Sequence, residues 1–205
     1  MKKTISNLLI VTIVVVLSGC AASYRQVNPP TIHYNSHDLQ DGIGFSYKYD
    51  VLRERGNKKY ANKENKKGVK LIAVKITNNT DSVINIGRDV AFYSGNNQIF
   101  PMEPMAIKES LKQFVPGYLP YLLLTFTNLY VTNGNTTETY PIGLVLGPAI
   151  TVGNMAMAGS ANKNMLNELN EYYLMSKDIQ KGETIYGIIG VRDIGYIPIS
   201  VKMIK

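Results

Sequence analysis

The chain has one cysteine, Cys20, and the residues in front of it decide what its thiol can do. Leu17, Ser18 and Gly19 stand directly before it. Further upstream, a basic pair at positions 2 and 3 is followed by a run, residues 8–17, that is apolar except for one threonine. A basic head, an apolar run and a small-residue site are the three parts of a secretory signal peptide. The start of the chain is therefore predicted to be an export signal that ends at the cysteine.

The junction Leu17-Ser18-Gly19-Cys20 resembles the lipobox of bacterial lipoproteins. The resemblance implies cleavage before Cys20, which makes residues 1–19 a lipoprotein signal peptide, and a diacylglyceryl thioether on the cysteine sulfur. It also implies three acyl chains, and because each buried CH₂ contributes about 0.8 kcal/mol, such an anchor is effectively permanent. The aspartate that usually retains lipoproteins in the inner membrane is replaced by Ala21. We expect a lipid-anchored protein of the cell envelope, in the outer membrane where the cell has one.

Two other interpretations of this segment are open. Ile5 to Leu17 could form one transmembrane helix, but these residues would rise only about 20 Å, against about 30 Å for the hydrocarbon core of a bilayer. Cys20 could be a buried or redox-active thiol, which the signal in front of it disfavours. With Cys20 acylated, no cysteine is left for a disulfide or as a nucleophile.

His33 and His37 are the only histidines. A separation of four residues could place two imidazoles on one side of a helix, as in some metal sites. No helix is indicated here, because the segment follows two prolines, and no third ligand is near. We therefore predict no metal site, and the same count excludes a Ser-His-Asp triad from the rest of the chain.

Carboxylates leave one catalytic alternative open. Asp89, Glu103 and Glu109 lie near one another in the sequence and could form a pair of acids, as in glycosidases. Isolated acids on turns are usually solvated, so we predict a protein that is not an enzyme and has no cofactor.

The basic character of the chain is concentrated in one window. Without the two lysines of the signal, the remaining chain has a net charge of +5, and residues 53–67 alone carry this excess. The window is expected to be a loop between strands, either simply solvated or attracted to an anionic surface. Its basic residues are Arg53, Arg55, Lys58, Lys59, Lys63, Lys66 and Lys67.

Alternation of apolar and polar residues predicts most of the secondary structure. Residues 20–41 lack it and are expected to be a lipidated tether, whereas residues 42–205 are expected to form one domain. Seven strands are predicted, which favours a mainly β fold, an immunoglobulin-like antiparallel β-sandwich. Their approximate ranges are 43–51, 68–77, 82–86, 90–93, 98–102, 184–192 and 196–204.

Residues 103–175 are expected to be a hydrophobic, mostly helical insertion between strands five and six. A short helix starts at Pro104, and another is predicted from 161 to 174 with Ser160 as its cap. Between them, two apolar runs, 118–131 and 141–158, flank a polar turn, and Gly143 and Gly147 would allow close helix approach. The runs could pack on the sandwich, dip into lipid, or dock a partner or another copy. Their candidate contact residues are Tyr118, Tyr121, Leu122, Leu123, Phe126, Leu144 and Leu146.

The body also resembles a group of uncharacterised lipoproteins of Bacteroidetes. The resemblance is carried by residues 55–60 (Arg-Gly-Asn-Lys-Lys-Tyr), 74–79 (Val-Lys-Ile-Thr-Asn-Asn), 141–143 with 153–155, and 160–163. It implies an envelope location and brings no known activity.

From these features we expect a lipid-anchored, non-catalytic cell-envelope protein that acts as a binding or interaction module. The alternative is a structural envelope component that assembles, or contacts the membrane, through residues 118–158. The partners are the membrane, through the lipid on Cys20, and an envelope protein. Nucleic acid is excluded as a partner because the protein is exported.

Overall fold

The computed structural model describes residues 19–192 and 194–204, which divide into two compact units. The first unit contains residues 19–23 and 113–161, and the second contains residues 24–112 and 162–204. Most of the predicted signal peptide, including Leu17 and Ser18, lies outside the described residues.

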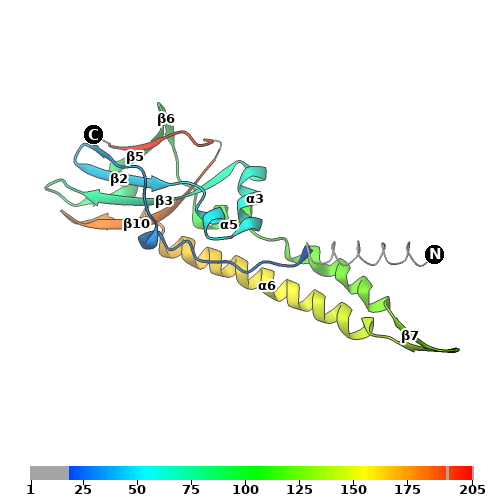
Figure 1. The fold of residues 1–205 in the computed structure, drawn as a ribbon. Coiled ribbons are helices and arrows are strands. Elements are labelled where there is room, and N and C mark those ends of the chain that lie inside the picture. The colour runs from blue at the N-terminus through cyan, green and yellow to red at the C-terminus, as the bar shows by residue number, and fades with distance from the viewer. Residues whose placement is uncertain (1–18, 193, 205) are drawn as a thin grey trace. The chain divides into compact units, whose positions relative to one another are not determined.

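The main sheet of the second unit has four antiparallel strands in the order β1-β2-β3-β10. Figure 1 shows β2, β3 and β10 side by side in it. The period-two patterns correctly predicted β2 and β10, and the nearly continuous apolar sequence correctly predicted β3 as a central strand. The strand bounds are β1 Asp38–Gln40, β2 Ile43–Lys48, β3 Val69–Asn78 and β10 Thr184–Arg192.

A second sheet has the order β11-β5-β6, and a third pairs β4 with β9. The predicted hairpin around Gly95 is confirmed as the β5–β6 turn. Phe45 of β2 and Phe92 of β5 lie in one apolar core, with their rings 6.1 Å apart. The bounds are β4 Ile84–Asn85, β5 Val90–Ser94, β6 Asn97–Ile99, β9 Asp178–Ile179 and β11 Ile199–Met203.

One face of β3 packs on the apolar core that contains Phe45 and Phe92, and helices cover its opposite face. This explains why both faces of the strand are apolar. Gly190 pairs with Leu71 across the sheet, and a Cβ at Gly190 would lie 2.6 Å from the Ile107 side chain of α5. The helices that lie wholly within the described part of this unit are η1 Pro29–Thr31, α2 Val51–Glu54, α3 Lys58–Lys67, α4 Ile86–Asp89 and α5 Pro104–Leu111. Of these, α5 begins at the proline that the sequence indicated.

The expected loop over residues 53–67 is wrong, because α2 and α3 occupy this segment. In α3 the buried residues are Tyr60, Ala61 and Glu64, which share one side of the helix at spacings of three and four. The helix ends at Gly68, whose φ of 61° suits glycine at a helix C-terminus. Two apolar residues among six charged ones in α3 are too few to be recognised as an amphipathic pattern.

The predicted mainly β, immunoglobulin-like sandwich is also wrong. The protein is mixed α/β, with 38% helix, 30% strand and four small antiparallel sheets. The basic window is helical, and residues 103–175 are not one insertion. Their two ends belong to the second unit, where Ile107, Leu111, Met165 and Leu169 are buried.

The first unit consists mainly of residues 113–161, here named the apolar hairpin. Its first limb is the 3-10 helix η2 Val115–Phe126, and its tip is the two-stranded sheet of β7 Leu129–Asn133 and β8 Thr136–Tyr140 (Figure 1). Its second limb is the first part of α6 Gly143–Glu171. Because α6 runs through Pro148 and Ser160, the two separate segments predicted here are wrong. Pro148 lies in the second turn, where its ring is exposed and one backbone hydrogen bond is lost.

Part of the expected tether is folded onto the second unit. Val27 is fully buried, and Glu168 of α6 holds the segment around it. The carboxylate accepts from the Tyr24 hydroxyl at 2.5 Å, from the Val27 amide at 3.1 Å and from the Asn28 amide at 2.7 Å. Three donors around one buried carboxylate fix residues 24–28 as part of the fold.

Replacing Glu168 by alanine should destabilise the second unit by about 3 kcal/mol, because three buried donors lose their acceptor. Chemical denaturation of the full-length protein in detergent measures this. Asn167→Ala, one position away and exposed, is the matched control and should change stability by less than about 0.5 kcal/mol. Equal effects of the two changes would contradict the assigned role of Glu168.

Candidate membrane-contact site

Large apolar side chains of the apolar hairpin are exposed. Phe126 is 81% exposed and Val145 is 71% exposed. Of the seven predicted contact residues, five are exposed, Tyr121 is partly exposed and Tyr118 is buried. The interpretation in which these runs are buried core does not fit this exposure. The exposed five are Leu122, Leu123, Phe126, Leu144 and Leu146, to which the structure adds Phe114, Val145, Val152 and Met157.

The first part of α6 has an inverted distribution of side chains. Its buried positions are small or polar, namely Gly143, Gly147, Thr151, Asn154 and Ala158. Its exposed positions include four large aliphatic side chains, at 144, 145, 146 and 152. A helix of a water-soluble protein shows the opposite arrangement. Small residues toward the protein and large apolar residues outward are typical of helices packed in a bilayer.

Among the described residues, α6 is the only helix long and apolar enough to cross a membrane by length and composition. Its most apolar window has a mean hydropathy of 1.3, and only 22% of that window is buried. A core helix of a soluble protein passes the same test of length and hydropathy but is mostly buried. The exposure of α6 therefore separates it from that class.

The two limbs of the hairpin approach closely through glycine. A Cβ at Gly143 would lie 2.2 Å from the Leu124 carbonyl oxygen, and one at Gly147 would lie 2.6 Å from the Thr125 amide nitrogen. The Gly143 amide donates to the Thr127 carbonyl at 2.9 Å. The close approach expected from the glycine spacing is therefore confirmed, with η2 as the partner of α6.

Polar groups on the inner side of α6 are satisfied within the unit. The Thr151 hydroxyl donates to the Gly147 carbonyl at 2.8 Å, and the Asn154 amide group donates to the Ile150 carbonyl at 2.8 Å. Residues 113–161 contain a single charged residue, Glu138, which lies in the polar β7–β8 tip. The two limbs therefore expose few polar or charged groups that would need to be solvated by water.

The residues that follow Cys20 are seated in the same unit. The Ala21 amide donates to the Asn154 Oδ1 at 2.6 Å. Gln113 makes two bonds to Ala22, accepting from its amide at 3.0 Å and donating to its carbonyl at 2.6 Å. Both side chains are buried, and sequence reasoning missed them. For Asn154 the available signal was an amide group inside an apolar run.

Cys20 itself is partly exposed and lies close enough to Tyr118 and Tyr121 to interact electrostatically with both. Tyr118 also donates to Gln113 Oε1 at 3.3 Å. The predicted acylation site thus belongs to the compact unit that carries the exposed apolar side chains.

The seven predicted basic contact residues have different environments in the second unit. Arg55 donates to the Val27 carbonyl at 2.9 Å and to the Thr31 hydroxyl, so it holds the N-terminal segment. Arg53 is exposed on α2. The five lysines lie on α3, where the only acid, Glu64, points inward and accepts from the Leu71 amide at 2.7 Å.

The residues considered for catalysis are not assembled into a site. His33 and His37 are exposed, and within residues 19–192 and 194–204 no three His, Cys, Asp or Glu side chains lie close enough to hold a metal ion. The three acids have separate partners. Asp89 pairs with Arg88, Glu103 accepts from Tyr173, and Glu109 pairs with Lys108 and Lys112.

Gly147→Ala should destabilise the apolar hairpin by about 1–3 kcal/mol, because the added methyl group forces η2 away from α6. Gly153→Ala is the matched control on the same helix, where an added Cβ meets no atom within 4 Å. It should be neutral or stabilising by up to about 1 kcal/mol. Thermal unfolding of the full-length protein in mild detergent distinguishes the two, and a similar loss for both would contradict the limb contact.

Burial raises the pKa of the Glu64 carboxyl to about 7, although the Leu71 amide opposes this shift. In the unfolded chain the same carboxyl ionises near pH 4.5. The pKa of Glu64 is higher in the folded state than in the unfolded chain. The stability that the folded protein gains from protonated Glu64 is therefore complete below about pH 4.5 and is lost as the pH rises through about 7. Unfolding free energy should therefore fall by up to about 3 kcal/mol between these limits, relative to Glu64→Gln. Denaturant titrations of the natural protein and of Glu64→Gln at pH 5 and pH 8 measure this fall. The same change in unfolding free energy between the two pH values in both proteins would contradict the prediction.

Comparison of the chain with protein-family models, curated proteins and solved structures found no match. The functional interpretation therefore rests on the chemistry and geometry of the chain itself.

Proposed function

We propose that this chain is a lipid-anchored, non-catalytic cell-envelope protein whose apolar hairpin is a second attachment to the membrane, beside the lipid on Cys20. The observation that carries the proposal is the inverted face of α6, with small and polar residues inward and large aliphatic residues outward. The second unit is then the part presented to the envelope, where it serves binding or interaction.

The exposed side chains are sufficient for such an attachment. Transfer of one large apolar side chain out of water contributes about 1.5–3 kcal/mol when burial is complete. Six such side chains, Leu123, Phe126, Leu144, Val145, Val152 and Met157, are each at least 47% exposed. In water they would form a large apolar surface of the kind that marks a membrane or protein contact. A bilayer removes this area from water without requiring a complementary partner surface.

The second limb nearly reaches the thickness of a hydrocarbon core and the first limb is shorter, which suits a hairpin that enters the bilayer. The part of α6 inside the apolar hairpin, residues 143–161, rises about 28 Å, close to the roughly 30 Å of the hydrocarbon core. The 3-10 limb rises about 2.0 Å per residue, which gives a length of about 24 Å. The tip carries threonines, asparagines and Glu138, which favour water or headgroups, so the tip sets how deep insertion can proceed.

Self-assembly through the same surface is the alternative that the exposed residues also allow, because a second copy would cover the same side chains. The two differ in what surrounds the outward residues. Membrane insertion places acyl chains against them, whereas assembly places protein there.

The natural chain has no tryptophan, so a single introduced tryptophan reports its own surroundings. In full-length Phe126→Trp reconstituted into liposomes, we expect lipids brominated on the acyl chains to reduce the emission by roughly half or more. Phe100→Trp is the matched control in the second unit, because Phe100 is 75% exposed and should remain unquenched. Bromine atoms at different depths of the acyl chain report how far the tip enters.

The proposal fails if Phe126→Trp is no more quenched than Phe100→Trp. A blue-shifted but unquenched emission from Phe126→Trp, together with chemical cross-linking into oligomers, would support assembly instead.

A further inference from the structure

The lysines of α3 form a cluster on one side of that helix. Lys59, Lys63, Lys66 and Lys67 are separated by three, four, seven or eight residues, apart from the adjacent pair 66–67, so they project to the same side. The opposite side carries Tyr60, Ala61 and Glu64 into the interior. Within α3 no acid is therefore exposed beside the cluster.

Packing of α3 against α5 adds a fifth ammonium group. Lys63 donates to the backbone carbonyl of Lys112, which directly follows α5. Partial burial, together with the neighbouring charges of Lys67 and Lys112, holds the pKa of Lys63 below its ordinary value. These five residues, Lys59, Lys63, Lys66, Lys67 and Lys112, are here named the lysine cluster.

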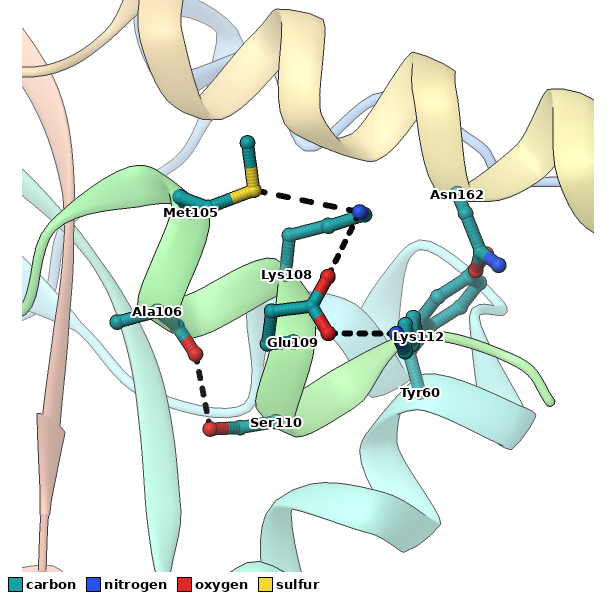
Figure 2. Close-up of polar contacts among 8 residues, drawn as sticks. All are labelled: Tyr60, Met105, Ala106, Lys108, Glu109, Ser110, Lys112 and Asn162. Carbon is teal, nitrogen blue, oxygen red and sulfur yellow. Dashed lines mark hydrogen bonds and ion pairs between the residues drawn. The ribbon is translucent and has the colours of Figure 1, made fainter.

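One acid faces the lysine cluster from α5. Glu109 pairs with Lys112 at 2.5 Å and with Lys108 at 2.7 Å (Figure 2). The charge of Glu109 is shared between Lys108 and Lys112. An excess of positive charge remains at this surface of the second unit.

The chain connects the lysine cluster directly to the apolar hairpin. Lys112 is joined by one peptide bond to Gln113, the first residue of the hairpin. On the returning limb, Lys163 follows Ala161 by two positions, and α6 continues through both. Positive residues thus border the apolar hairpin in the sequence on both sides. Lysines at the ends of membrane segments reach toward the charged headgroups.

We propose that the lysine cluster binds the headgroups of anionic phospholipids and thereby selects an acidic membrane surface. This inference rests on the proposed function, because the bilayer that receives the apolar hairpin also supplies the headgroups. Ammonium groups close together repel one another, and anionic headgroups relieve this repulsion. Polybasic segments next to a membrane insertion attract acidic lipid in this way, with a strength that falls as salt is added.

The test uses full-length Asn62→Trp, in which the new side chain lies at an exposed position of α3 between Lys59 and Lys66. The protein is reconstituted into liposomes that contain a dansyl-labelled headgroup, in either neutral phosphatidylcholine or a mixture with phosphatidylglycerol. We expect energy transfer from the tryptophan to dansyl to be about two-fold higher in the acidic liposomes and to fall toward the neutral value in high salt.

Two charge variants of Asn62→Trp distinguish an effect of the lysine cluster from an effect of the protein's overall net charge. Changing Lys59, Lys63, Lys66 and Lys67 together to glutamine should abolish the difference between the two lipids. The matched control changes four other lysines of the second unit to glutamine, Lys75, Lys177, Lys181 and Lys202, and should keep it. If the first variant fails to fold, Lys66→Gln with Lys67→Gln, both exposed, should still reduce the difference by about half.

Equal energy transfer in neutral and acidic liposomes, or an equal loss in the matched control, would overturn the inference. The bromolipid quenching of Phe126→Trp in neutral liposomes reports the apolar hairpin separately. Quenching there without a lipid preference at Asn62→Trp would leave the proposed function standing and reject the lysine cluster. A lipid preference without quenching would reject insertion of the hairpin and retain the lysine cluster as a peripheral contact.

Discussion

Close contact between η2 and α6 is the constraint on which the first unit depends. Gly143 and Gly147 have no side chains, so the backbone of residues 124–127 lies where a Cβ would otherwise be. The side of α6 that makes this contact carries small residues, and the large aliphatic side chains of α6 are left exposed. Two limbs joined in this way gain little from the hydrophobic effect, because the residues between them are small. Their association relies on van der Waals packing and on hydrogen bonds, as expected for helices in lipid.

The N-terminal segment is fixed at two places, one in each unit. Asn154 and Gln113 hold residues 21–22 in the first unit, while Glu168 and Asn57 hold the residues after Tyr24 in the second. Each bond is made to backbone atoms, so it does not depend on which side chains the segment carries. A lipid on Cys20 would consequently be attached to an ordered part of the first unit. A long flexible tether would have allowed the protein to move away from the membrane surface.

The sequence correctly predicted those elements whose own residues show a clear apolar pattern or a clear start signal. The strands β2, β3, β5 and β10 have alternating or continuously apolar sequences, and α5 starts with proline. Strand β1 was missed, although Asp41-Gly42, with both φ angles positive, is a recognisable hairpin turn.

What could not be predicted depends on contacts between distant residues. The single apolar side of α3 becomes visible only when β3 and α5 cover it. Pro148 and several glycines indicated a break in α6, yet the helix continues because Pro148 is close to its start and Gly147 is needed for packing. Asn154 and Gln113, which hold residues 21 and 22, lie more than 90 positions away from them in the sequence. Their partners could not be inferred from spacing.

On the proposed function, the lipid and the apolar hairpin act in sequence. An exposed apolar surface of this kind would promote aggregation in water, since nothing in the described residues covers it. Acylation confines the protein to the membrane surface, so insertion of the hairpin becomes an intramolecular step with a high effective concentration. The absence of charge from residues 113–161, apart from Glu138, removes the main penalty of that step. The charged residues are retained in the second unit, which can then stay folded in water while the first unit meets the lipid.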